Sequence, residues 1–104
     1  MDRVIDLEAI VQREVEDYAS GGSWKTTFYP VSDTVRQHYT VLAIPDYPRK
    51  SRAGIVVAAR IVGVKVIIDE DNTDRPLVEE LMRAGIPREQ IILAYAGETL
   101  PPQE

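Results

Sequence analysis

His38 is the only histidine in a chain that has no cysteine, so chemistry that needs an imidazole or a thiol has a single candidate. Asp33 and Arg36 lie close to it in the sequence, and a histidine with a carboxylate partner can transfer protons near neutral pH. No nucleophile elbow, second histidine or phosphate-binding glycine loop accompanies it. The pattern favours a half-exposed strand residue bonded to a turn. For the block of Asp33, Arg36 and His38 it favours a structural role, in which Asp33 and Arg36 fix the hairpin register, over a recognition site. An enzyme that uses His38 with Asp33 stays open as a third hypothesis.

Residues 69–74 place four carboxylates in six positions. An EF-hand calcium loop needs a glycine at its sixth position, where this chain has Asp74. A strand end followed by a helix N-cap explains the same residues, because acids stabilise the positive end of a helix. Lys65 and Asp69 resemble part of a nuclease site only weakly, because the further acid that a two-metal centre needs is missing. We therefore predict no metal, no cofactor and no catalytic residue.

Four aromatic residues, Trp24, Phe28, Tyr29 and Tyr39, could in principle stack on nucleic-acid bases. Lys25 is the only base that interleaves with them. This favours core or cross-strand packing over a base-stacking platform.

The net charge is −5, but the two signs are segregated along the chain. Both ends are acidic, whereas residues 36–65 carry six bases against one acid: Arg36, Arg49, Lys50, Arg52, Arg60 and Lys65, against Asp46. Because phosphate neutralisation supplies most non-specific affinity for DNA, the acidic total argues against autonomous duplex binding. A solvated loop explains Arg49, Lys50 and Arg52. Direct nucleic-acid contact through residues 36–65, including contact by a homo-oligomer that brings basic patches together, is the main alternative.

Length and composition indicate one globular domain over residues 1–104. The chain is 44% apolar and 28% charged, and it can bury a core without disulfide or metal staples. Its longest apolar run, residues 55–59, is far shorter than the roughly 20 residues of a membrane helix. We expect a cytoplasmic protein that does not enter a membrane.

The elements that must position these residues follow from the periodicity. Apolar residues at helical spacing predict a helix over residues 4–19, which ends at Gly21-Gly22. Two strands are predicted next, over 24–31 with Pro30 at an edge or bulge and over 38–44, followed by a loop from Pro45 through Arg52. A hairpin of 55–62 and 65–69 then turns through Gly63-Val64 in a type II′ turn. The last predicted elements are a helix over 74–84, a strand over 91–95 and a flexible tail over 96–104. The predicted fold class is α+β: an N-terminal helix, an antiparallel sheet with a central hairpin, a second helix packed on one sheet face and a short final strand.

Two blocks of this sequence resemble the XisI family of fdxN element excision controlling factors. The first resembles the segment with which that family enters a strand, and it consists of Asp33, Thr34, Arg36, His38 and Tyr39. The second resembles a pattern of lysine, apolar strand, acids, helix and Gly-Ile-Pro, and it includes Lys65, Asp71, Thr73, Asp74, Gly85, Ile86 and Pro87. The resemblance spans roughly residues 5–95, and it marks Asp33, Arg36, His38, Tyr39, Lys65, Asp71 and Thr73 as family-motif residues for partner binding.

The chain departs from the family pattern at several positions. Its hairpin turns through Gly63-Val64 instead of Asp-Gly, and Ala58 and Ile67 replace a family histidine and tryptophan. The family's Phe-His-Pro-Pro ending is reduced to Tyr95-Ala96, so reactions that need the two missing histidines are excluded. The resemblance implies a non-enzymatic accessory protein that controls excision of a DNA element together with a XisH-type partner, with contact to DNA indirect or weak.

Overall fold

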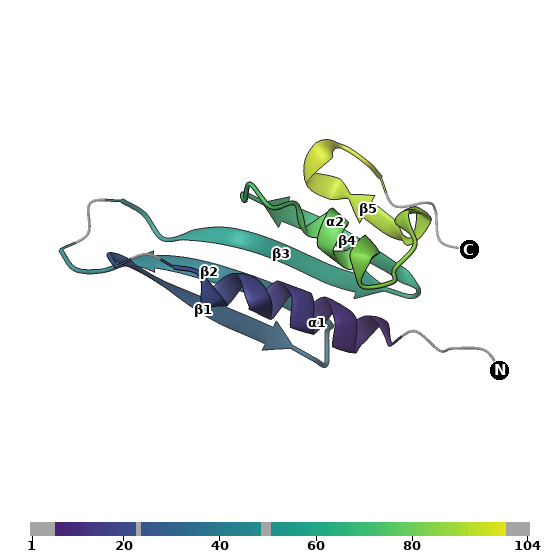
Figure 1. Cartoon of the computed structure of the whole chain (residues 1–104), viewed down its shortest axis with the longest axis horizontal. Coiled ribbons are helices and arrows are strands. Elements are labelled where there is room, and N and C mark those ends of the chain that lie inside the picture. The colour runs from purple at the N-terminus through teal and green to yellow at the C-terminus, as the bar shows by residue number, and fades with distance from the viewer. Residues whose placement is uncertain (1–5, 23, 49–50, 100–104) are drawn as a thin grey trace.

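The computed structural model describes residues 6–22, 24–48 and 51–99, which form two α-helices and a five-stranded sheet (Figure 1). The elements are α1 (Leu7–Asp17), η1 (Tyr18–Ser20), β1 (Thr26–Asp33), β2 (His38–Pro45), β3 (Gly54–Val62), β4 (Lys65–Asp71), α2 (Leu77–Arg83), η2 (Arg88–Gln90), β5 (Ile91–Leu93) and η3 (Ala94–Ala96), where η marks a 3-10 turn. The predicted α+β class is confirmed. No helix in the described ranges is long and apolar enough to cross a membrane.

The sheet has the strand order β1-β2-β3-β4-β5. Neighbours from β1 to β4 are antiparallel, as predicted, but β5 runs parallel to β4. The predicted antiparallel sheet is confirmed for these strands, and the last pair departs from it because the connection through α2 returns the chain to the start of β4. Pro30 lies in β1, an edge strand of the sheet, where a missing N–H is tolerated.

The β3–β4 connection confirms the predicted type II′ turn. Gly63 has a φ of +63°, and Val62 pairs with Lys65 across the turn. Gln37 is the only non-glycine with a positive φ within the described ranges, so Val64 has a negative φ. A positive φ at the first central residue alone distinguishes type II′ from type I′.

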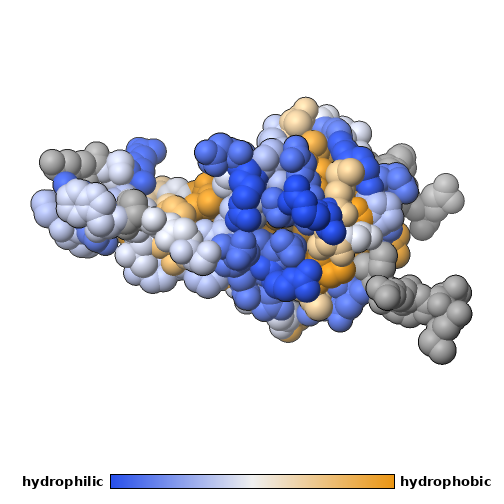
Figure 2. All heavy atoms as spheres, in the orientation of Figure 1, coloured by the Kyte–Doolittle hydropathy of each residue, from blue (hydrophilic) through white to orange (hydrophobic). Residues whose placement is uncertain are grey.

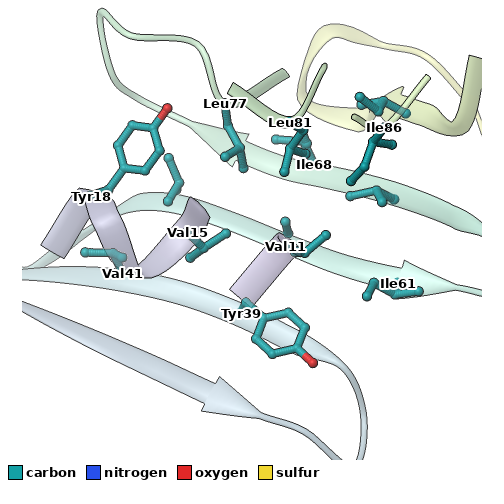
Figure 3. Close-up of a cluster of buried hydrophobic side chains, with 14 residues drawn as sticks. Val11, Val15, Tyr18, Tyr39, Val41, Ile61, Ile68, Leu77, Leu81 and Ile86 are labelled. Atoms are coloured by element: carbon teal, nitrogen blue, oxygen red, sulfur yellow. The ribbon is translucent and has the colours of Figure 1, made fainter. Parts of the chain in front are cut away.

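Helix α1 covers one face of the sheet and supplies part of the core (Figure 3). It begins after Asp6, whose carboxylate accepts a hydrogen bond from Ala9 N at 3.0 Å. The predicted residues 4 and 5 lie outside the described residues. Val11 and Val15 are fully buried against the sheet and α2, and the cluster includes Tyr39, Val41, Val57, Ala59, Ile61, Val66, Ile68, Leu77, Leu81, Ile86 and Ile91. Burial of these side chains is the main stabilising term of the fold.

The final strand is shorter than predicted. It ends at Leu93, and a 3-10 turn over Ala94–Ala96 replaces its last two residues. Glu98 then folds back: its carboxylate accepts hydrogen bonds from Leu93 N and from Arg88, both at 2.8 Å. These bonds hold the pKa of Glu98 below its usual value, the backbone N–H having the larger effect. Flexibility of the tail 96–104 stays a prediction, and residues 100–104 lie outside the described residues.

The molecule has two unlike regions. We call residues 24–29 and 42–56 the arm and the rest of the described chain the body; residues 49–50 within this range are not described. The strands of the arm extend beyond α1, and the molecule measures 52 × 30 × 27 Å (Figure 1). No described arm residue is buried. The β2–β3 register shifts between Val41 and Leu42, where the buried stretch ends, and such a bulge bends a strand.

Candidate functional site

Four of the family-motif residues, Asp33, Arg36, His38 and Lys65, lie at the same end of the sheet. Asp33 ends β1 and His38 begins β2, while Lys65 begins β4 after the β3–β4 turn. In the register, Asp33 pairs with His38, which pairs with Arg60. We call the surface formed by Asp33–His38, Arg60 and Lys65 the turn end. It lies at the opposite end of the strands from the arm.

Asp33 organises the turn between β1 and β2. Its Oδ1 accepts hydrogen bonds from the backbone N–H groups of Val35 and Arg36 at 3.1 and 3.0 Å, and its Oδ2 accepts one from the Arg36 guanidinium at 2.9 Å. The expected contact between Asp33 and Arg36 is thus present. The backbone N–H of Arg36, followed by its guanidinium, holds the pKa of Asp33 below the usual value. The Arg36 side chain remains 79% exposed, so most of its surface faces solvent.

His38 is exposed and makes no side-chain hydrogen bond with Asp33 in the part of the chain that is described. Arg36 engages the carboxylate that a proton-transfer pair would need. Arg60, the cross-strand neighbour of His38, forms an ion pair with Asp69 at 2.8 Å. Lys65 donates to the carbonyl oxygen of Glu89 at 3.2 Å, so Lys65 and Asp69 have different partners.

Tyr39 belongs to the core and not to the surface. Its side chain is fully buried, and its hydroxyl has no hydrogen-bond partner among the residues that the structure describes. Burial, with the nearby Glu8 carboxylate as the next cause, raises the pKa of Tyr39. We therefore leave Tyr39 out of the candidate surface.

Asp71 and Thr73 lie at the other end of β4 and fix the start of α2. The Asp71 carboxylate accepts hydrogen bonds from Leu77 N and from the Thr73 hydroxyl, both at 2.7 Å. Asp71 ends β4, which confirms the predicted strand end, but the N-cap position of α2 is Pro76, and the side chain that accepts from the first helical N–H is that of Asp71. The predicted start of this helix at residue 74 was wrong, because Asp71 caps from six residues away and Pro76 precedes the first turn. The described residues hold no group of three or more metal-ligating side chains.

A cleft of about 620 Å³ lies beside this cap and is lined by Asp17, Tyr18, Phe28, Ile55, Thr73 and Arg75, among others. Arg75 bridges its wall, with an ion pair to Asp17 at 3.2 Å and its guanidinium 4.2 Å from the centre of the Tyr18 ring. Burial raises the pKa of Tyr18 to about 12. Tyr18 therefore stays protonated and donates a hydrogen bond to the carbonyl oxygen of Arg75. These contacts join α1 to the loop before α2.

The basic segment 36–65 does not form one surface among the described residues. Arg36, Arg60 and Lys65 lie at the turn end with the partners given above. Arg52 is exposed in the arm, at the far end of the strands. Arg49 and Lys50 lie outside the described residues. The structure thus separates the candidate nucleic-acid contacts into two places.

The expectation that the aromatic residues pack in the core or across strands was wrong for Trp24. Its side chain is 84% exposed, because the strand begins only at Thr26 and this part of the arm lies beyond the core. Tyr29 is 47% exposed, whereas Phe28 packs partly against the core and Tyr39 lies within it. Sequence reasoning also missed Tyr47, which is 83% exposed in the loop after β2. For Tyr47 the available signal was its position beside Pro48 in the predicted loop, whereas Trp24 lay within the predicted strand and carried no such signal.

Comparison with known proteins gives one consistent result. A family model described as "XisI protein" matches residues 1–101. A crystal structure of a XisI-like protein from Anabaena variabilis is 26% identical, with a TM-score of 0.77, over 88% of this chain and 85% of that one. A second structure, of fdxN element excision controlling factor XisI from the same organism, is 26% identical with a TM-score of 0.70 over 86% and 83%. No curated protein matches the sequence.

Proposed function

This chain belongs to the XisI family, and from that premise we propose that it is a non-enzymatic accessory protein in the control of DNA element excision, acting through a XisH-type partner. The role in excision control rests on the family and on the similar structure of an fdxN element excision controlling factor. The XisH-type partner and the absence of catalysis belong to the proposal alone, and the geometry of the turn end supports them.

The observation that carries the proposal is the gathering of Asp33, Arg36, His38 and Lys65 at one end of the sheet. Their tasks differ. Asp33 holds the turn through backbone hydrogen bonds, while the Arg36 side chain is 79% exposed and His38 is exposed as well. An exposed ion pair such as Arg36 with Asp33 contributes little to stability, so we infer that Arg36 serves a contact to another protein.

The charge distribution supports a protein partner at this end. Arg36, His38, Arg60 and Lys65 bring basic side chains there, whereas α1 is rich in acids. Complementary charge favours a partner with an acidic patch and speeds its encounter. Because Asp33 already engages Arg36, His38 lacks the carboxylate partner that acid–base catalysis by this pair would need.

Co-expression with the cognate XisH-type protein tests the proposal. We expect the two proteins to co-purify, and Arg36→Ala to weaken the complex at least about tenfold without changing the fold. Arg13→Ala is the matched control, because Arg13 is also an exposed arginine paired with a neighbouring acid, but on α1. Failure to associate at micromolar concentration, or equal losses from both variants, would overturn the proposal.

A further inference from the structure

The tip of the arm contains a hollow lined by exposed aromatic rings. Its volume is about 490 Å³, and its walls are Trp24, Lys25, Thr26, Pro45, Asp46, Tyr47, Pro48 and Ser51. Trp24 and Tyr47 are each more than four-fifths exposed. Single exposed apolar residues need no explanation, but two large aromatic rings on one hollow mark a binding surface.

Cations accompany these rings. The Lys25 ammonium lies 4.3 Å from the centre of the Trp24 ring, in a cation–π arrangement. Arg52 is exposed on the neighbouring segment and forms no ion pair within the described ranges. The one acid in the hollow, Asp46, closes the tip by donating its backbone N–H to Lys25 O at 2.9 Å, while its carboxylate accepts a long hydrogen bond from Thr27. The tip therefore combines flat rings with two positive side chains.

The length of the arm separates this tip from the acidic helices. Figure 2 shows it as a narrow projection at the left, away from the strongly hydrophilic surface over the helices. The molecule is 52 Å long, whereas charges in physiological salt are screened over about 8 Å. Acids at the far end of the body are thus screened from a phosphate group at the tip. The net charge of −5, which argues against DNA binding by the whole surface, does not argue against binding there.

We propose that the arm tip binds a single strand of nucleic acid, with an unpaired base stacked on Trp24 and neighbouring phosphates beside Lys25 and Arg52. Stacking on an aromatic side chain requires an unpaired base, because the faces of paired bases are covered by the duplex. DNA and RNA share this chemistry. A proline-rich peptide also suits aromatic grooves, but it leaves Lys25 and Arg52 without an anionic partner. The inference goes beyond the proposed function and does not depend on it.

Trp24 is the only tryptophan, so its fluorescence reports directly on the site. The intact protein is titrated at low salt with three unlabelled ligands: a single-stranded oligothymidine of about ten nucleotides, the same sequence in a duplex, and oligouridine. We expect saturable quenching by the single strands and little by the duplex. Quenching by oligothymidine alone identifies DNA as the ligand, and equal quenching by oligouridine supports the shared single-strand chemistry.

Variants then separate stacking from charge, with affinity read by anisotropy of a labelled strand. Trp24→Ala should weaken binding at least about tenfold, and Trp24→Phe should recover most of it. Lys25→Ala and Arg52→Ala should each remove about one phosphate contact. The slope of the logarithm of the binding constant against the logarithm of the salt concentration should then become shallower by about 0.7 for each variant. Tyr95→Ala and Arg13→Ala, which alter exposed residues of the body, are the controls. Unaltered melting curves show that the variants are folded.

Three results would overturn the inference. The first is the absence of quenching at low salt. The second is equal affinity of Trp24→Ala and the unchanged protein for single strands. The third is quenching by a proline-rich peptide but not by the oligonucleotides, which would identify a peptide groove. None of these readouts involves the XisH-type protein, so the outcome is independent of the test of the proposed function.

Discussion

The body and the arm are built from the same strands, yet they hold together in different ways. In the body, α1 and α2 cover the sheet, and fourteen residues form one buried cluster. In the arm, only Phe28 and Val56 among the described residues pack against that cluster, and no described residue is buried. Backbone pairing alone stabilises a strand ribbon weakly. Large aromatic side chains in the arm therefore add little to folding, which is why their exposure points to binding.

The sharpest test of this comparison replaces one leucine in each region. Leu81 of α2 is fully buried in the core cluster, whereas Leu42 is half-buried at the root of the arm. Leu81→Ala should cost about 3 kcal/mol, because it removes buried surface and leaves a cavity, and should lower Tm by more than about 12 °C. Leu42→Ala should cost less than about 1 kcal/mol. Equal losses in thermal denaturation would show that the arm belongs to the core.

A second, smaller effect concerns the loop that joins the sheet to α2. Asp71→Ala removes the acceptor for Leu77 N and for the Thr73 hydroxyl, and we expect a loss of about 1–2 kcal/mol in urea denaturation. Asp74 is an exposed neighbour with no ion pair among the described residues, so Asp74→Ala should stay within about 0.5 kcal/mol. A larger effect at Asp74 would assign the cap to Asp74 instead of Asp71.

The smallest predicted effect is a pH dependence at the turn end. The pKa of Asp33 is lower in the folded state than its ordinary value of 3.8, so the ionised carboxylate stabilises the fold. This contribution is complete above the unfolded pKa and is lost as the pH falls through the lower, folded pKa. The difference in Tm between the unchanged protein and Asp33→Asn should therefore be largest near neutral pH and shrink below 3.8. A difference that does not vary with pH would assign the effect to turn geometry alone.

The sequence predicts the body better than the arm. Helical spacing in α1, glycine at the β3–β4 turn and alternating strands each carry a local signal, and the structure confirms them. The parallel pairing of β5 carries no such signal, because direction depends on how the crossover through α2 packs. Periodicity also cannot show where burial stops. Trp24 has a residue type common in strands, but its exposure follows from the distance between the arm and the helices.

The candidate site was predicted only in part, because local spacing is visible in the sequence but strand register is not. The proximity of Asp33 and Arg36 follows from their spacing in a turn, and the structure contains that contact. That Lys65 joins them, and that Asp71 and Thr73 do not, depends on strand register and on the ends at which the turns fall. The Arg60–Asp69 ion pair likewise joins neighbouring strands across the hairpin. It could not be predicted from the sequence, because it depends on the strand register.

The central claim is that the turn end binds a XisH-type partner while the arm does not take part. Calorimetric titration of that partner with the unchanged protein, Arg36→Ala and Trp24→Ala tests it most directly. We predict a Kd of about 1 μM or tighter, at least about tenfold weakening by Arg36→Ala and no change from Trp24→Ala. Binding that survives Arg36→Ala but is lost in Trp24→Ala would contradict the claim and assign the partner to the arm.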